Sequence, residues 1–135
     1  MTNEELINKA AALIDFKKLG KAAATAGNVG CVLETGNGNL YEGVCVDTGS
    51  GMGFCAEHTA ISQMLTKREY TIKKIVAVWK DYNGDVYVIP PCGRCREFIK
   101  QTTESNLETE VILDKAKTVK LRELLPFHDW WKKQD

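Results

Sequence analysis

The sequence predicts an α/β layered sandwich with a mixed central β-sheet. Segments with apolar residues at helical spacing alternate along the chain with short segments rich in β-branched residues, an order that is typical of α/β folds. The pair Asn37-Gly38 lies between two of the strand-like segments and indicates an antiparallel hairpin within the sheet. No internal repeat or Pro/Gly/Ser-rich linker interrupts residues 1–135, so we expect a single domain.

The amino-terminal half is expected to contain a helix, a hairpin and a second helix. Apolar side chains recur at helical spacing from Leu6 to Ile14. We expect this first helix to run from Asn3 to Ala24 and to end at Gly27. The elements expected after it are strands at 29–34 and 40–46, a glycine-rich loop at 48–53 and a helix at 56–65.

The carboxy-terminal half is expected to alternate strands with helices. The pair Pro90-Pro91 stops an extended segment, and Cys92 and Cys95 fall in the first turn of the helix that follows. A short helix is expected after Pro126, and the alternating lysines at 115–120 indicate a solvated hairpin edge. The elements expected here are strands at 72–79 and 86–89, a helix at 93–101 and strands at 110–113 and 118–120.

Composition and charge narrow the class of protein. The chain has 18 Lys plus Arg and 18 Asp plus Glu, which excludes a strongly basic nucleic-acid-binding protein, so we expect no nucleic acid polymer as partner. The apolar runs are too short to span a bilayer and the first residues lack a secretory signal, so we expect a cytoplasmic protein without a membrane partner. Five cysteines are an odd number that fits poorly with a closed set of disulfides and indicates thiols.

Three of these cysteines have the spacing of a metal site. Cys92 and Cys95 are three residues apart and share one face of a helix, and Cys55 can reach them from the start of a neighbouring helix. Three thiolates leave one open position on a tetrahedral zinc ion, where a water becomes more acidic and can attack an electrophile. Glu57, next to the first ligand, is then well placed to move protons.

The order Cys-Ala-Glu and then Pro-Cys-x-x-Cys, each where a loop enters a helix, resembles the cytidine deaminase family. The matching segments cover nearly the whole chain: Val29-Gly30, Tyr41-Glu42-Gly43, Cys55 to Ile61, Pro91 to Arg96 and Arg122 to Pro126. The resemblance implies a cytidine deaminase-like α/β/α sandwich with zinc held by Cys55, Cys92 and Cys95. It implies that zinc activates a water for attack on C4 of a cytosine nucleoside, while Glu57 passes protons to N3 and to the departing amine. It also implies a homotetramer.

Two further polar residues are expected beside the thiolates. Three thiolates leave a zinc site with a charge of about −1, which weakens the metal as a Lewis acid unless donors draw the charge away. His58 and Arg96 share helical faces with Cys55 and Cys92, so we expect them to act as such donors. Cytidine deaminases usually have Arg at the position of His58, and a core histidine is the alternative reading of that residue.

The substrate side departs from the family. Cys45 and Asp47 stand where ribose-binding members commonly have Asn and Glu, and Gly27 stands where they have a base-packing Phe. Several segments are instead similar to the blasticidin S deaminases, which act on a nucleoside antibiotic. That resemblance implies that Arg94 and Trp131 lie close to the substrate, and we expect one of the adjacent tryptophans to anchor the chain end by burial. Asn28, Cys45, Asp47 and Ala56 complete the expected substrate-binding set.

Other interpretations of the same residues stay open. A structural zinc would need a fourth ligand, for which Cys31, Cys45, His58 and His128 are available. A zinc or nucleoside-binding module of the same fold without turnover is the second hypothesis for function. Deamination of a base within RNA or DNA is disfavoured, because the chain lacks a basic footprint. The sequence leaves both a role in pyrimidine salvage and a role in antibiotic detoxification open.

Overall fold

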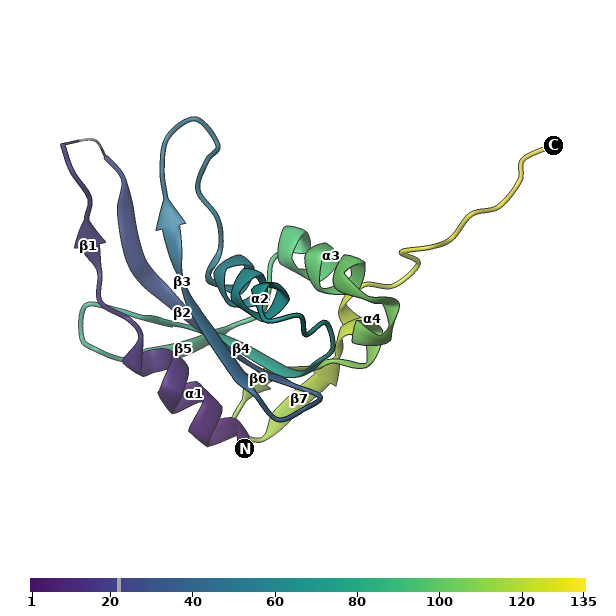
Figure 1. Cartoon of the computed structure of the whole chain (residues 1–135), viewed down its shortest axis with the longest axis horizontal. Coiled ribbons are helices and arrows are strands. Elements are labelled where there is room, and N and C mark those ends of the chain that lie inside the picture. The colour runs from purple at the N-terminus through teal and green to yellow at the C-terminus, as the bar shows by residue number, and fades with distance from the viewer. Residues whose placement is uncertain (22) are drawn as a thin grey trace.

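A computed structural model describes residues 1–21 and 23–135 and forms a seven-stranded β-sheet with helices on both faces (Figure 1). The elements in chain order are α1 (Asn3–Ala12), β1 (Lys17–Lys18), β2 (Thr25–Thr35), β3 (Leu40–Asp47), α2 (Ala56–Thr66), β4 (Ile72–Lys80), β5 (Val86–Ile89), α3 (Gly93–Thr102), the 3-10 helix η1 (Glu104–Glu108), β6 (Glu110–Asp114), β7 (Lys117–Lys120) and α4 (Leu121–Leu124).

The sheet is mixed, as predicted. β2 pairs antiparallel with β3 on one edge and with β4 and β1 on the other. β4 pairs parallel with β6 near Ile75 and antiparallel with β5 from Ala77 onward, so two strands share one edge of β4. β7 closes the sheet as an edge strand, which agrees with the solvated hairpin expected at 115–120.

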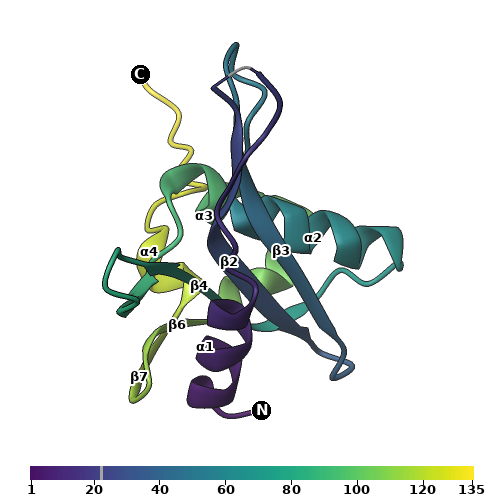
Figure 2. The ribbon, with the colours of Figure 1, turned by 90° about the vertical axis from the view of Figure 1, so that its left-hand side faces the viewer.

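Alternation of side chains along the strands produces two apolar layers. Cys31 and Leu33 of β2 face α2 and α3, whereas Val32 between them faces α1. β4 follows the same rule, with Ala77 on the side of α2 and Val76 on the side of α1. α1 therefore covers one face of the sheet and α2 with α3 covers the other (Figure 2), which confirms the predicted layered sandwich.

Gly43 in β3 allows α2 to rest directly on the sheet. A Cβ atom at this position would lie 2.5 Å from Cβ of Thr59 and 2.7 Å from the backbone nitrogen of Ala60, closer than packed atoms approach. The Thr59 hydroxyl also donates to the carbonyl oxygen of Val44 at 2.9 Å. These contacts fix the first turn of α2, and with it Cys55 and Glu57, against the strand.

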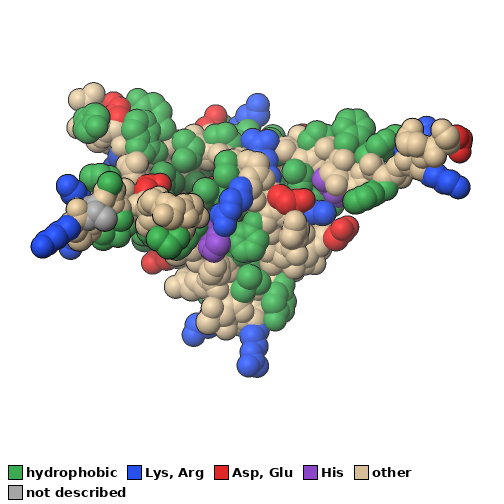
Figure 3. All heavy atoms as spheres, turned by 90° about the horizontal axis from the view of Figure 1, so that it is seen from above, with side chains coloured by type: hydrophobic (Ala, Val, Ile, Leu, Met, Phe, Trp, Pro, Cys, Tyr) green, Lys and Arg blue, Asp and Glu red, His purple; other side chains and the backbone are tan. Residues whose placement is uncertain are grey.

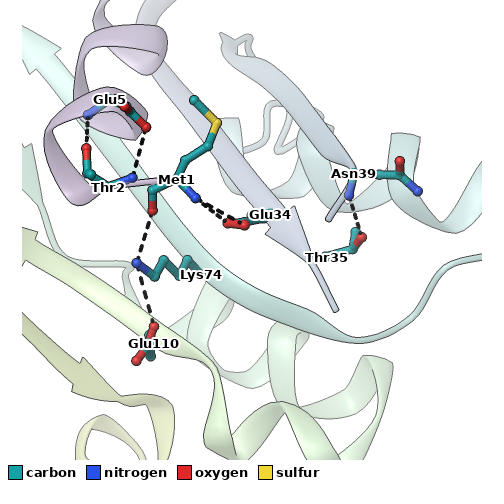
Figure 4. Close-up of polar contacts among 8 residues, drawn as sticks. All are labelled: Met1, Thr2, Glu5, Glu34, Thr35, Asn39, Lys74 and Glu110. Atoms are coloured by element: carbon teal, nitrogen blue, oxygen red, sulfur yellow. Dashed lines mark hydrogen bonds and ion pairs between the residues drawn. The ribbon is translucent and has the colours of Figure 1, made fainter. Parts of the chain in front are cut away.

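The start of the chain is held to the sheet by polar contacts (Figure 4). Thr2 and Glu5 form a capping box at the beginning of α1. The Met1 ammonium lies 3.4 Å from the Glu34 carboxylate on β2, and Lys74 of β4 donates to the Met1 carbonyl oxygen at 3.2 Å. α1 is therefore joined to two central strands at its amino end.

The first helix is shorter than predicted. It ends at Ala12 and not at Ala24, and Gly27 belongs to β2, where its φ is +80°. The chain turns back after Ala12 so that the Asp15 N–H donates to the Gly27 carbonyl and β1 pairs with β2. Pairing of Lys17 and Lys18 with β2 outweighs the helical propensity of the residues that follow Ala12. Residue 22, inside the predicted helix, lies outside the described residues.

The carboxy-terminal helix lies earlier than predicted. α4 comes before Pro126, because buried Leu121 anchors it to the core. Within the described residues no helix follows Pro126, and the last residues run away from the body (Figure 1). Trp130 and Trp131 are 70% and 92% exposed, so neither anchors the chain end by burial. None of the described helices is long and apolar enough to cross a membrane.

Candidate active site

Three cysteine sulfurs meet where α2 and α3 begin. The Sγ atoms of Cys55, Cys92 and Cys95 all lie within 4.8 Å of one another, and those of Cys55 and Cys92 are 3.8 Å apart. Tetrahedral zinc with Zn–S bonds of about 2.3 Å needs sulfurs about 3.8 Å apart. The donor set therefore fits zinc by residue type and by spacing.

The beginning of α3 supports an ionised sulfur at Cys92, whereas burial raises the pKa of the Cys55 and Cys95 thiols. Cys55 and Cys92 are the N-cap residues of α2 and α3, and neither side chain caps its own helix. The free N–H groups and dipoles of two helix ends thus point at the cluster. Burial opposes ionisation of Cys92, but donors that include the N–H groups of Cys95 and Arg94 outweigh it and lower the pKa of this thiol.

The cluster leaves a coordination position open. Within the described part of the chain, no fourth Cys, His, Asp or Glu joins the three ligands. Cys31 is a core thiol of β2, and Cys45 accepts a hydrogen bond from the Val29 N–H at 3.3 Å. His128 lies near Asp129 at the chain end. This arrangement favours a site with room for water over a closed structural site.

Glu57 is a buried residue of the adjoining pocket. Only 5% of its surface is exposed, and burial raises the pKa of its carboxyl group above the ordinary value, although its own N–H and the Cys95 thiol act in the opposite direction. A carboxyl group with a raised pKa can both accept and return a proton near neutral pH.

The pocket has a volume of about 400 Å³, within the range of small-molecule sites. It brings together five of the expected substrate-binding residues from four separate segments of the chain: Asn28, Cys45, Asp47, Ala56 and Arg94. The same pocket contains Cys55, Cys92 and Glu57 in its lining, so two of the three candidate ligands, the candidate proton carrier and the substrate-side residues share one cavity.

The comparisons with known proteins agree with this geometry. A family model described as the cytidine and deoxycytidylate deaminase zinc-binding region matches residues 2–109. The chain belongs to this deaminase family. No curated protein sequence matches it significantly.

Solved structures of cytidine deaminases have the same fold as this chain. The cytidine deaminase from Burkholderia pseudomallei is 26% identical with a TM-score of 0.71, and the match covers 93% of this chain and 98% of that one. The cytidine deaminase from Mycobacterium leprae is 25% identical with a TM-score of 0.71, over 93% and 99% of the two chains. The enzyme from Bacillus anthracis, at 19% identity and a TM-score of 0.73 over 93% and 88%, supports the fold alone. The resemblance to blasticidin S deaminases stays a prediction.

A bulge in β2 brings Asn28 to the pocket of the deaminase. The register of β2 against β3 shifts between Ala26 and Gly30, so that β2 has extra residues there. Gly27 has a φ of +80°, and a Cβ at this position would lie 2.2 Å from the carbonyl oxygen of Asp15. Only glycine fits this position, which explains why the base-packing Phe of the family is absent from it.

Arg96 and Trp131 do not take the places expected from the sequence. Arg96 donates to the carbonyl oxygens of Pro91 at 2.7 Å and Leu124 at 3.0 Å, so it joins the start of α3 to α4 and does not face the thiolates. Trp131 lies on the projecting carboxy-terminal segment, outside the described lining of the pocket. The spacing rule failed for Arg96 because its guanidinium group donates to backbone carbonyl oxygens, one of them on α4, which spacing along α3 does not reveal.

His58 also differs from its expected role. Its Nδ1 lies 2.9 Å from Nη2 of Arg94, and the described hydrogen bonds join it to no cysteine. Its ring stacks on Phe54 with centroids 4.8 Å apart and lies 5.2 Å from the ring of Phe98. His58 is therefore neither a thiolate donor nor a simple core histidine.

Sequence reasoning missed several residues that line the pocket. They are Val29, Gly53, Phe54, Ile89 and Pro90. Phe54 is the most informative, because it precedes Cys55 and bridges back to Val46 of β3. An aromatic residue directly before the first ligand is the signal that could have marked it.

Proposed function

We propose that this deaminase converts a cytosine nucleoside and water into the uracil nucleoside and ammonia. The observation that carries the proposal is the three-thiol cluster with the buried carboxyl group of Glu57 beside it, in one pocket. Zinc, when bound by Cys55, Cys92 and Cys95, supplies a water acidic enough to attack C4 near neutral pH.

Glu57 moves the protons that this reaction needs. Its carboxylate takes a proton from the attacking water and gives it to N3, which makes C4 a better electrophile. It then takes the proton of the new C4 hydroxyl group and gives it to the amine, so that the C4–N bond breaks and ammonia leaves. The raised pKa of Glu57 supports this double role.

The substrate-side residues support a small nucleoside. Asp47 accepts a hydrogen bond from a sugar hydroxyl, and Cys45 lacks the amide that ribose-binding relatives place there. Acidic, basic and apolar side chains are interspersed on the face seen in Figure 3, which offers no continuous basic surface for a polymer. Cytidine, deoxycytidine and blasticidin S are the candidate substrates, corresponding to pyrimidine salvage or antibiotic detoxification.

We also propose that the enzyme is a homotetramer and that it works in the cytoplasm. Residues 1–135 act as one deaminase domain, and exposed apolar side chains such as Phe16, Leu19 and Met52 support subunit contacts in a homotetramer. Five free thiols support a reducing cytoplasm. Light scattering of the purified protein should give four times the mass of one chain, whereas a monomer would contradict the tetramer.

A substrate panel tests the proposed reaction. The zinc-loaded protein is mixed with cytidine, deoxycytidine, cytosine and blasticidin S, and the ultraviolet change from cytosine to uracil is followed together with ammonia release. We expect turnover of at least one nucleoside. If all four compounds remain unchanged while zinc is bound, the binding module without turnover becomes the better account.

A further inference from the structure

Two consecutive prolines precede the candidate ligand Cys92. β5 ends at Ile89 and α3 begins at Gly93, so Pro90, Pro91 and Cys92 form a short connection between two regular elements. A proline has no backbone N–H group, so hydrogen bonds can hold it only through its carbonyl oxygen. The position of Cys92 therefore depends on which groups bind the carbonyl oxygens of this connection.

Arg96 binds the carbonyl oxygen of Pro91. Its Nε donates to this oxygen at 2.7 Å, and among the described residues no other group donates to it. Nη1 of the same guanidinium group donates to the carbonyl oxygen of Leu124 at 3.0 Å. Leu124 is the last residue of α4, where carbonyl groups have no partner within the helix. One side chain thus joins the residue before Cys92 to the end of α4.

α4 is a well-anchored support for Arg96. Leu121, its first residue, is fully buried in the apolar layer on the side of α2 and α3, and its N–H donates to the Thr109 carbonyl oxygen at 2.9 Å. No described carboxylate lies at ion-pair distance from Arg96. The described side-chain hydrogen bonds of Arg96 therefore go to two backbone oxygens and to no acidic group.

Pro91 also adjoins the candidate proton carrier. It is buried and lines a small internal cavity together with Glu57 and Ile89. Its carbonyl group is bonded to Cys92, whose Sγ lies 3.8 Å from Sγ of Cys55. Distances in a zinc site vary by only about 0.2 Å, so a larger shift of Pro91 would carry one sulfur out of the range that zinc accepts.

A guanidinium group suits this task better than an ammonium group. Its donors lie in one plane and point in fixed directions, so two of them can hold two carbonyl oxygens at a set separation. The lysine ammonium group is a point charge on a flexible stem and fixes no such separation. The planar group of Arg96 therefore contributes geometry as well as charge.

We infer that Arg96 is a positioning residue of the metal centre. It holds Pro91 against α4 and so fixes the Cys92 sulfur for zinc, although Arg96 is neither among the clustered ligands nor in the described lining of the pocket. The support of the centre thereby extends to a helix near the end of the chain. This inference rests on the zinc centre of the proposed function.

Zinc affinity measures this positioning. Competition with a chelating dye gives the zinc Kd of the wild type, Arg96→Gln and Arg96→Lys. We expect Arg96→Gln to weaken zinc binding by about 10- to 100-fold, the usual effect of losing a group that orients a metal ligand. Arg96→Lys keeps the charge but loses the planar group, so most of the loss should remain. Wild-type affinity in Arg96→Lys would overturn the inference, because charge alone would then suffice.

Arg122→Gln is the matched control for the stability of α4. It removes the ion pair of Arg122 with Glu108, and Arg122 has no described hydrogen bond to Pro91. We expect this variant to keep the zinc affinity of the wild type. An equal loss of affinity in Arg96→Gln and Arg122→Gln would mean that Arg96 only stabilises α4, and would overturn the positioning of Cys92.

Cobalt gives a spectroscopic signature of the geometry. Co²⁺ replaces zinc in the purified protein, and the absorption bands of a tetrahedral thiolate site report the arrangement of the sulfurs. We expect Arg96→Gln to shift or weaken these bands and Arg122→Gln to leave them unchanged. An unchanged spectrum in Arg96→Gln would contradict a role of Arg96 in placing Cys92.

Hydrogen exchange tests the anchoring of the segment and does not depend on turnover. Mass spectrometry follows exchange in residues 92–96 and 55–59 of the wild type and of Arg96→Gln as purified. We expect faster exchange in 92–96 of the variant and no change in 55–59. If the wild type binds no zinc, the proposed function fails, and this measurement still shows whether Arg96 anchors the segment. Unchanged exchange in 92–96 would overturn the inference even if zinc affinity falls, because Arg96 would then act through its charge.

Discussion

Cys55 and Cys92 each occupy the position before a helix where a hydroxyl or carboxylate side chain commonly caps the backbone. A thiol caps poorly, so the stability of a cap is given up and the sulfur remains available for a metal. The N–H groups that lack a capping side chain face the cluster instead and reduce the cost of holding three thiolates together.

The zinc content of a Cys92 variant tests whether this cluster binds the metal. Cys92 is exposed, so Cys92→Ser should fold but lose one sulfur ligand, and the metal content should fall from about one zinc per chain to well below half. Cys31→Ala, in the core and outside the cluster, is the control and should retain the metal. Metal analysis after gel filtration measures both, and equal zinc in the two variants would rule out Cys92 as a ligand.

Glu69 provides a pH-dependent contribution to stability. It accepts hydrogen bonds from Tyr41, Thr35, Asn39 and Asn37, which lower its pKa from 4.5 to about 2. Because the folded pKa is depressed, this contribution is complete above the unfolded value near 4.5 and is lost as the pH falls toward 2. Acid unfolding of the wild type should therefore be steeper between pH 4.5 and 2 than that of Glu69→Gln. Parallel curves would show that Glu69 contributes nothing.

Individual site residues differ in how far the sequence predicts them. Cys92 and Cys95 follow from local spacing, because two ligands on one helix turn can be recognised without the rest of the fold. Glu57 follows from its place two residues after Cys55. The position of Phe54 in the pocket and the hydrogen bond between His58 and Arg94 do not follow from spacing, because both depend on how separate segments of the chain pack together.

At the scale of elements, the strands other than β1 were predicted within a few residues, whereas β1 and the terminal helices were not. β4 and β6 are rich in β-branched residues and largely buried at their centres, so their pattern is unambiguous. The segment after Ala12 has helical composition but pairs with β2. A local sequence pattern does not predict pairing with a strand farther along the chain. The bulge that places Asn28 depends on the same pairing.

The contact between β3 and α2 predicts a stability effect. Gly43→Ala inserts a methyl group against Thr59, and we expect it to lower the free energy of unfolding by about 1–3 kcal/mol. Gly49→Ala, in a loop with open space around it, is the matched control and should change stability by no more than about 0.5 kcal/mol. Thermal unfolding of both variants measures the difference. A Gly43→Ala protein as stable as the control would contradict the close packing of α2.

At the scale of the whole molecule, the pocket forms from the β2 bulge, the end of β3, the segment that leads into α2 and the segment that leads into α3. The sequence predicted several members of this site but neither Phe54 nor the pocket itself, because the shape of the pocket depends on how four distant segments converge. The projecting segment after Pro126 lies apart from it (Figure 1).

Removal of residues 130–135 tests the role of the projecting segment. Trp130 and Trp131 are largely exposed, so we expect the truncated protein to keep its melting temperature and its zinc. Calorimetry and metal analysis measure both. A drop in kcat/KM of more than tenfold without loss of stability would mean that Trp131 reaches the pocket during turnover, contrary to its position here.

The central claim is that a Cys55, Cys92 and Cys95 zinc centre and Glu57 together deaminate a cytosine nucleoside. The most direct measurement is ammonia release per bound zinc by the wild type and by Glu57→Gln, with the best nucleoside of the panel. We expect about one zinc per chain in both proteins, and a rate at least about 100-fold lower in the variant. Equal ammonia release from the two proteins, or none from zinc-loaded wild type, would contradict it.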